Sequence, residues 1–503
     1  MKKITAAVIS LILALIFVAG CGKDPDTTPE TLDLRDENGT GLYTVVLPSS
    51  ATEYEKKAAR AIASAVSAKT VSDGEEPSGR CIFVGKTSSE ASGTLYNTLS
   101  DGQYSIRNDG ENILIAGTDD VNILYAAEKF VSLLLPVGDS GLTFAVKNCV
   151  GGVYTVDDGP VEGKFLFSKA MGRYKTQGRT TADDKGVALY GAADGIEFNA
   201  DCSGSVTVTV SVSDELNCGE YSGLYLTAYI DGERVEERFH VNTHGSAEIV
   251  IAEGLEQGKH SFGIYRQTEQ GNDGLRVVGV SFDGTFAETP APGDYMIEFV
   301  GDSLTSGFGI MDSLEYDGAW QGDAIYCDAT LAYGFLTAKN LNADYSIVAV
   351  QGMGVYCGPQ SRTMNEIYNC YPFNDKADYV YPNTRPADVV VVQMLANDME
   401  TKEQFGATDE QIFEAFKNLL LKIRERNPNA KIIVVSYKLC TDQQRAVVNE
   451  LGGKDAGFYY HDIPSDGNGH GGHPSVDAHK ATTKNLTMYI QKLLGIYERK
   501  KAD

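Results

Sequence analysis

The residues from Val389 to Met394 form an almost unbroken apolar run, and this run most constrains the fold of the chain. Such a run is typical of a strand buried on both faces, as in a parallel sheet with helices on each side. Other strand-like runs lie at Tyr295–Val300, Tyr345–Val350 and Lys431–Ser436. Helix-like stretches with one apolar face separate them. We therefore predict a three-layer α/β/α domain with a parallel sheet over residues 293–500.

Two other patterns precede this domain. Residues 41–150 mix strand-like and helix-like stretches, with a hairpin signal at Asn108-Asp-Gly110, and predict a small α/β accessory domain. Residues 155–288 lose helical periodicity and alternate in short runs, which predicts an antiparallel, jelly-roll-like β-sandwich. Three domains suit the length that remains after the first twenty of 503 residues, at ~150 residues each.

The N-terminus has the pattern of an export signal. Lys2 and Lys3 precede the apolar run Ile4–Ala19, which as a helix would reach about 24 Å, short of the ~30 Å hydrocarbon core. We predict a cleaved signal peptide at residues 1–20. The run ends in Val18-Ala-Gly-Cys21, which resembles the lipobox of bacterial lipoproteins. This resemblance implies acylation of Cys21, a flexible tether over residues 21–40 and an extracytoplasmic protein anchored to the bacterial membrane through that lipid alone. The alternative is an ordinary cleavage site beside a coincidental cysteine.

Charge and cysteine spacing exclude some classes of function. The formal net charge is -26, which disfavours nucleic acid and anionic lipid as partners. The cysteines after Cys21 form no C-x-x-C pair, so a thiolate zinc site is poorly supported. An exported chain can form disulfides, and Cys202 with Cys218 is the most plausible local pair.

Candidate catalytic residues follow the predicted strands of the last domain. Ser303 lies in a small-residue turn directly after Tyr295–Val300, and His473 precedes the final helix. Gly352 and Asn397 follow the next two strands. Loops beyond the carboxyl edge of one parallel sheet meet in space. A serine esterase needs a nucleophile, a base and donors for the oxyanion, and these four residues can supply them.

These four sites resemble the sequence blocks of the SGNH hydrolases, also called GDSL esterases. The resemblance implies Ser303 as nucleophile and His473 as base. It also implies an oxyanion hole made by the backbone N–H groups of Ser303 and Gly352 and the side chain of Asn397. The enzyme would need no cofactor and no metal.

A closer resemblance, to carbohydrate esterase family 2, covers residues 165 to 500. It rests on Thr330–Lys339, Ala343–Ala349 and, at the end of the sandwich, His260–Glu269 with Phe282-Asp-Gly284. Those enzymes are acetyl esterases that act on polysaccharides. The resemblance therefore implies a carbohydrate acetylesterase that acts on an acetylated polysaccharide. The sequence leaves open which polysaccharide is used, the oligomeric state and the role of residues 41–150, for which a spacer or a binding domain is the simpler interpretation.

Two departures from the family pattern keep alternatives open. Leu395-Ala396 precede Asn397-Asp398, where the family usually has a glycine. The orienting aspartate usually found two or three residues before the histidine is replaced by Gly471 and His470. We expect a Ser–His dyad held by a backbone carbonyl, with Asp466 as another possible third member. The alternatives are a non-catalytic glycan-binding lipoprotein and a lipase or thioesterase of the same superfamily.

Overall fold

The computed structural model describes residues 30–496, except 75–78, 138–139, 154–158, 161–162, 171, 184, 215–216, 270–274, 312–323, 371–380, 382–384 and 438–439. The predicted signal peptide and the predicted lipidation site, Cys21, lie outside the described residues. The chain divides into two compact units, the first holding most of residues 30–153 and the second residues from 154 onward. No helix among the described residues combines the length and apolar character needed to cross a membrane.

The first unit contains a six-stranded sheet in the order β3-β2-β4-β6-β5-β9. Neighbours from β3 to β6 are parallel, and β5 pairs antiparallel with β6 and β9. Asp109 pairs with Asn112, which confirms the predicted hairpin. The elements are β2 (Tyr43–Leu47), α1 (Glu53–Ala65), β3 (Lys69–Ser72), β4 (Arg80–Val84), α2 (Glu90–Tyr96), β5 (Gln103–Asp109), β6 (Asn112–Gly117), α3 (Asp120–Ser132) and β9 (Val150–Val153).

A three-stranded sheet in the same unit corrects the predicted tether. β1 (Thr31–Arg35) pairs antiparallel with β8 (Gly141–Ala145), which also pairs with β7 (Leu134–Val137). Leu32 and Leu34 are buried, because alternate residues of the strand face the core. The prediction of a flexible tether that reaches residue 40 was therefore wrong for Thr31–Arg35, because these residues form a strand of a folded sheet.

The second unit begins with ten antiparallel strands joined in one sheet. β14 pairs along most of its length with β18 on one side and β19 on the other. The antiparallel character is confirmed, but hydrogen bonds join the strands into a single sheet where we expected two. Cys202 is buried and Cys218 exposed, and both thiols are free. The strands are β10 (Phe165–Leu166), β11 (Tyr174–Gln177), β12 (Thr181–Asp183), β13 (Gly186–Leu189), β14 (Gly195–Val212), β15 (Leu224–Ile230), β16 (Glu233–Arg234), β17 (Phe239–Val241), β18 (Gly245–Arg266) and β19 (Leu275–Phe286).

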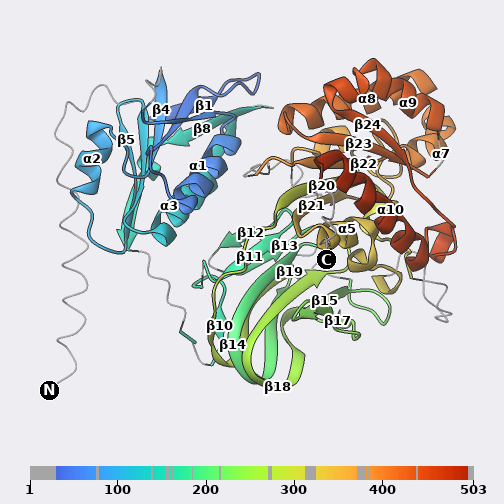
Figure 1. Ribbon diagram of the computed structural model, residues 1–503, viewed down its shortest axis with the longest axis horizontal. Helices are drawn as coiled ribbons and strands as arrows, with labels where there is room; N and C mark the ends of the chain where they lie inside the picture. The colour runs from blue at the N-terminus through green and yellow to red at the C-terminus, as the bar shows by residue number, and fades with distance from the viewer. Residues whose placement is uncertain are drawn as a thin grey trace, which may run out of the picture. The chain divides into compact units, whose positions relative to one another are not determined.

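A five-stranded, fully parallel sheet follows, in the order β21-β20-β22-β23-β24. Val390 and Val392 pack with α8 and α9, whereas Val389 and Val391 pack with α5 and α10. Figure 1 shows these helix pairs on opposite sides of the sheet, as predicted for a three-layer domain. The elements are β20 (Tyr295–Gly301), α4 (Ser303–Ser306), α5 (Tyr333–Asn340), β21 (Ala343–Ala349), α6 (Met364–Ile367), β22 (Val389–Gln393), α7 (Ala396–Phe405), α8 (Asp409–Arg426), β23 (Lys431–Ser436), α9 (Thr441–Glu450), β24 (Phe458–Asp462) and α10 (Val476–Leu494).

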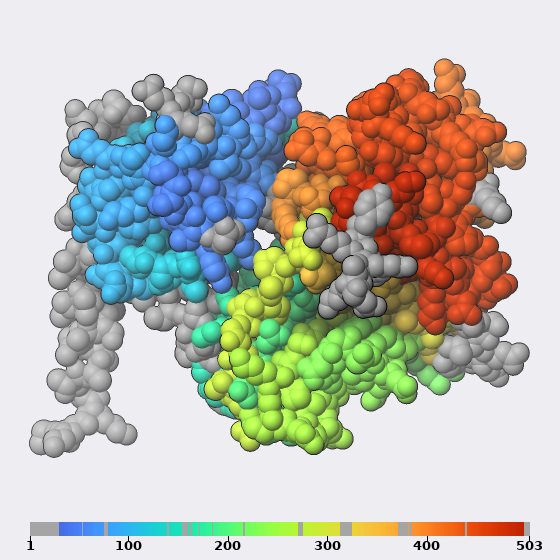
Figure 2. All heavy atoms as spheres, in the orientation of Figure 1, coloured from blue at the N-terminus to red at the C-terminus, as the bar shows by residue number. Residues whose placement is uncertain are grey.

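The antiparallel and parallel parts of the second unit lie directly against each other (Figure 2). The side chain of Arg179, which follows β11, is completely buried and lies 3.0 Å from the Glu298 carboxylate on β20. Its guanidinium also donates to the carbonyl of Tyr368 at 2.6 Å. At the other end of β11, Lys175 forms an ion pair with Asp344 at 2.8 Å. The antiparallel sheet is therefore fixed to the sheet that carries the predicted catalytic residues.

Candidate active site

Ser303 lies at the carboxyl end of β20, at the first residue of α4. Asp302 caps this helix, because its carboxylate accepts the Leu304 N–H at 3.0 Å. A Cβ at Gly301 would lie 2.0 Å from the Thr305 hydroxyl, so only glycine fits between strand and helix. Ser303 is 8% exposed. The small-residue turn thus presents the serine at the sheet edge, as predicted.

His473 lies in the loop between β24 and α10, and its ring is half-buried. Its Nδ1 is 3.1 Å from the backbone carbonyl oxygen of His470. A carbonyl only accepts, so Nδ1 carries the proton and Nε2 keeps its lone pair. Burial lowers the pKa of His473, and the His470 carbonyl partly opposes this shift. At neutral pH the ring is therefore neutral, with a basic nitrogen at Nε2.

The turn that follows Ser303 contacts the histidine loop directly. The Phe308 N–H donates to the Ser303 carbonyl at 3.2 Å, and the Phe308 and His473 rings lie 5.2 Å apart in an edge-on arrangement. The next residue, Gly309, accepts the His470 N–H at 2.8 Å. The structure thus brings the loops of Ser303 and His473 together at one edge of the sheet.

Asn397 lies in the first turn of α7, just after β22. Its Nδ2 is 3.1 Å from the Met353 carbonyl and 3.3 Å from the Asp302 carboxyl. Burial raises the pKa of Asp302 to about 7. The carboxyl group of Asp302 therefore contacts two parts of the predicted site. It caps the helix that begins at Ser303, the predicted nucleophile, and it accepts a hydrogen bond from Asn397, the predicted amide donor.

Leu395 explains one departure from the family pattern. Its φ is 96°, in the left-handed region that favours glycine, and its side chain is fully buried. The usual glycine of the family pattern would meet this backbone demand without strain. In this chain Leu395 adopts the strained conformation, which costs about 1–3 kcal/mol of stability at such positions. Its side chain packs in the hydrophobic core.

Gly352 lies just beyond β21, and its φ is 71°, which is also in the left-handed region. Any other residue at this position would have a strained backbone. The following turn is braced by Asp398, whose carboxylate accepts the N–H groups of Val355, Tyr356 and Cys357 at 2.8–3.0 Å. Four loops therefore carry the four predicted residues to the same edge of the parallel sheet.

Asp466 does not hold His473. Its carboxylate accepts the N–H and the hydroxyl of Ser475, at 3.0 and 2.5 Å, and the Asn468 N–H at 3.1 Å. Although desolvation acts to raise it, these bonds bring the pKa of Asp466 down to about 2. Asp466 therefore secures the entry to α10, and the Nδ1 of His473 is oriented by a backbone carbonyl, which sequence cannot display. The described residues contain no cluster of three His, Cys, Asp or Glu able to bind a metal.

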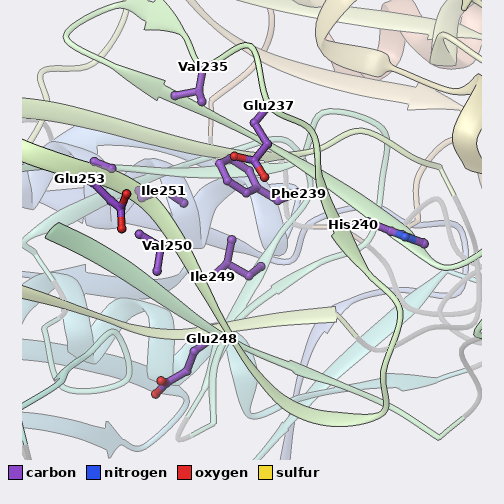
Figure 3. A pocket seen from close by; sticks show the side chains of 10 residues that line it. Val235, Glu237, Phe239, His240, Glu248, Ile249, Val250, Ile251 and Glu253 are labelled. Carbon is purple, nitrogen blue, oxygen red and sulfur yellow. The ribbon is translucent and has the colours of Figure 1, made fainter.

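A separate hollow of about 570 Å³ lies on the antiparallel sheet, between β17 and β18 (Figure 3). Apolar side chains such as Phe239 and Ile251 line it together with Glu237, Glu248 and Glu253. It contains none of the predicted catalytic residues, so its lining adds nothing to the site built around Ser303.

Comparison with known proteins agrees with this architecture. Residues 176–292 match the family model "Carbohydrate esterase 2 N-terminal". The chain is 27% identical over 294 residues to the cellulase/esterase CelE of Acetivibrio thermocellus, covering 54% of this chain and 34% of that protein. It is 24% identical over 280 residues to an acetylxylan esterase / glucomannan deacetylase of Cellvibrio japonicus, covering 51% of this chain and 76% of that protein.

A solved structure extends the likeness to the fold. The acetyl xylan esterase Est2A from the rumen bacterium Butyrivibrio proteoclasticus superposes with a TM-score of 0.58 at 21% identity, covering 67% of this chain and 99% of that chain. The second unit therefore shares the fold of solved family 2 carbohydrate esterases and of this acetyl xylan esterase. The residues that match the carbohydrate esterase 2 N-terminal model, 176–292, lie mostly in the antiparallel part of this unit. The chain spans about a third of the length of CelE.

Proposed function

We propose that this protein is a serine esterase that removes small acyl groups, acetyl above all, from polysaccharide hydroxyls. The observation that carries the proposal is the orientation of His473. Its Nδ1 is held by the His470 carbonyl, which leaves Nε2 basic, and its ring packs on the turn that begins at Ser303. A neutral imidazole with a basic Nε2, carried by a loop that contacts the turn of a serine at the start of a helix, is an arrangement suited to ester hydrolysis.

The reaction has two balanced steps. The Ser303 hydroxyl attacks the ester carbonyl while His473 takes its proton, and the tetrahedral oxyanion is bound by the N–H groups of Ser303 and Gly352 and by the Asn397 amide. Collapse breaks the bond to the sugar oxygen, which leaves with the proton from His473. Water, deprotonated by His473, then attacks the acyl-enzyme, and the acid is released as Ser303 regains its proton. The Asn397 amide must turn from Asp302 or Met353 toward the substrate to donate.

The substrate proposal is supported by relatives. The Cellvibrio japonicus relative is named an acetylxylan esterase / glucomannan deacetylase, and the Butyrivibrio proteoclasticus structure is an acetyl xylan esterase. We extend these activities to this chain as a class and propose an acetylated polysaccharide as the substrate. We also propose that the protein works outside the cell, anchored by a lipid on Cys21. The pattern of Lys2 and Lys3 followed by an apolar run that ends in Val18-Ala-Gly-Cys21 supports this location.

Turnover of p-nitrophenyl acetate tests the chemistry. We expect wild-type protein to hydrolyse it, Ser303→Ala and His473→Ala to lose at least about 1,000-fold in kcat, and a fluorophosphonate probe to label Ser303 alone. Undiminished turnover by Ser303→Ala would exclude the mechanism. A folded wild type that neither turns over the ester nor takes up the probe would favour the non-catalytic glycan-binding alternative.

The substrate class is tested with acetylated xylan, acetylated mannan and p-nitrophenyl esters of increasing chain length. We expect acetate release from at least one polysaccharide and slower hydrolysis of long acyl chains than of acetate. Faster hydrolysis of long chains would favour a lipase. For the location, incorporation of an alkyne fatty acid that disappears in Cys21→Ser is the expected result, and an unlabelled wild type would contradict the anchor.

A further inference from the structure

A glutamate of the antiparallel part reaches the predicted oxyanion hole. Glu269 lies three residues beyond β18 and is 7% exposed. Its Oε1 accepts the backbone N–H of Gln351 at 2.6 Å, so it contacts the residue directly before Gly352. Burial raises the pKa of Glu269 to about 7, while Ser306 of the α4 turn and the Gln351 N–H act to lower it. One carboxyl group thus faces both the loop of Gly352 and the turn of Ser303.

A second side chain holds the same segment from the other side. The Gln360 amide donates to the Gln351 carbonyl oxygen at 2.7 Å. The Gln351 carbonyl and the Gly352 N–H belong to one planar peptide group and point in opposite directions. Fixing the carbonyl with Gln360 and the preceding N–H with Glu269 therefore fixes the direction of the Gly352 N–H. Glycine alone, with its φ of 71°, would leave this peptide poorly defined.

The geometry points to Glu269 as a positioning residue for the oxyanion hole, supplied by the antiparallel domain and acting through the Gln351–Gly352 peptide together with Gln360. This inference rests on the proposed esterase function. If so, the antiparallel domain contributes to the reaction, because its Glu269 orients the Gly352 N–H of the parallel part of the second unit.

The surroundings of the second carboxyl oxygen of Glu269 agree with a role in positioning the Gln351–Gly352 peptide. Oε2 of Glu269 is buried and has no hydrogen-bond partner among the described residues. A buried polar atom without a partner destabilises a protein, and such atoms in native structures call for an explanation beyond stability. An apolar side chain would pack there without this cost. A side chain that accepts a hydrogen bond is needed at this position to bind the Gln351 N–H, and this need explains why the residue is polar.

Four variants of the full chain test the inference. Glu269→Gln keeps an oxygen that can accept the Gln351 N–H, whereas Glu269→Leu removes it. Gln360→Leu removes the hydrogen bond to the Gln351 carbonyl. It therefore disturbs the same Gln351–Gly352 peptide without changing Glu269. Lys175→Met is the matched control, because it weakens the contact between the two parts through Asp344, at the amino-terminal end of β21, while Gly352 lies beyond its carboxyl end.

The readouts are kcat and KM for p-nitrophenyl acetate, the rate of inactivation by a fluorophosphonate, and the melting temperature. We expect Glu269→Leu and Gln360→Leu to lower kcat by about 10- to 100-fold with KM within about twofold, because the oxyanion exists only in the transition state. Inactivation should slow in parallel, since the phosphonyl oxygen occupies the same hole. Glu269→Gln and Lys175→Met should keep kcat within about threefold.

The inference is overturned if Glu269→Leu and Gln360→Leu, folded at the assay temperature, keep wild-type kcat. It is also overturned if Lys175→Met loses as much kcat as Glu269→Leu, because the effect would then come from loosened domain contact. A wild-type protein without esterase activity would refute the proposed function itself, and that result is read from the wild type before any variant.

Discussion

Replacement of Gly309 by alanine should displace His473, the proposed catalytic base, without changing its chemical identity. A Cβ at Gly309 would lie 2.6 Å from the His470 carbonyl oxygen, 3.0 Å from Nδ1 of His473 and 3.1 Å from its Cγ. The new methyl group would therefore press on both partners of the hydrogen bond that orients the imidazole. Neither His473 nor Ser303 is altered, so any loss of activity reports on geometry.

The size of the effect follows from these distances. To reach an ordinary contact of 3.4 Å, the His470 carbonyl must retreat by about 0.8 Å. The Nδ1 to oxygen distance, now 3.1 Å, would then approach or exceed 3.5 Å, where the hydrogen bond is essentially lost. A misplacement of about 1 Å at a catalytic group costs about 100-fold in rate. Alanine at the φ of 64° adds a stability cost of about 1–2 kcal/mol.

The matched control is Gly472→Ala. Gly472 lies between His470 and His473, has φ of 81°, and a Cβ there would meet nothing within 4 Å. This variant therefore carries the same backbone strain without the clash. We expect kcat for p-nitrophenyl acetate to fall about 100-fold in Gly309→Ala and to stay within about threefold in Gly472→Ala, with both variants folded at the assay temperature. Equal kcat values in the two variants would refute the idea that the His470 carbonyl orients the base.

Three further predictions follow from the same contacts. Because the pKa of His473 is lowered, kcat/KM should fall on the acid side only below pH 6.5, and a pH–rate profile with its acid limb above pH 6.5 would contradict a buried base held by a carbonyl. Asp466→Asn should keep kcat within about threefold while lowering the melting temperature, and a 100-fold loss of kcat would instead make Asp466 a partner of His473. Arg179→Met should cost about 3–5 kcal/mol in urea unfolding, because Glu298 stays buried without its cation, and a cost below about 1 kcal/mol would show that the pair is not needed.

The parallel sheet was predictable because its strands carry a strong signal. Residues Val389–Val392 are all fully buried, and a strand in such a place can hold only apolar side chains. The antiparallel sheet was harder to predict. Val206–Val212 and Ala247–Ile251 had the pattern of short strands, yet they lie within β14 and β18, of 18 and 22 residues. Register shifts around Gly204 break the alternation, so the continuous strand is hidden in the sequence.

The candidate site divides in the same way. Ser303, Gly352, Asn397 and His473 follow predicted strands or precede a predicted helix, and their convergence follows from the topology alone. The carbonyl of His470 could not be predicted from its residue type, because every residue has a carbonyl. The contact of Glu269 with Gln351 joins residues 82 positions apart, and no local pattern encodes it. The conformation of Leu395 opposes its residue type and appears only in the structure.

The Nδ1 of His473 is held by a carbonyl where a triad would have an aspartate. This difference changes which groups of the proposed site must stabilise the transition state. An aspartate beside Nδ1 would stabilise the imidazolium that forms when His473 takes the serine proton. A carbonyl orients the ring but offers less charge stabilisation, and burial lowers the pKa of His473 further. The base is then neutral over a wider pH range but weaker. In the proposed mechanism a larger share of transition-state stabilisation therefore falls on the oxyanion donors. This is the reason to expect the Gly352 peptide to be held on both sides, by Glu269 and by Gln360.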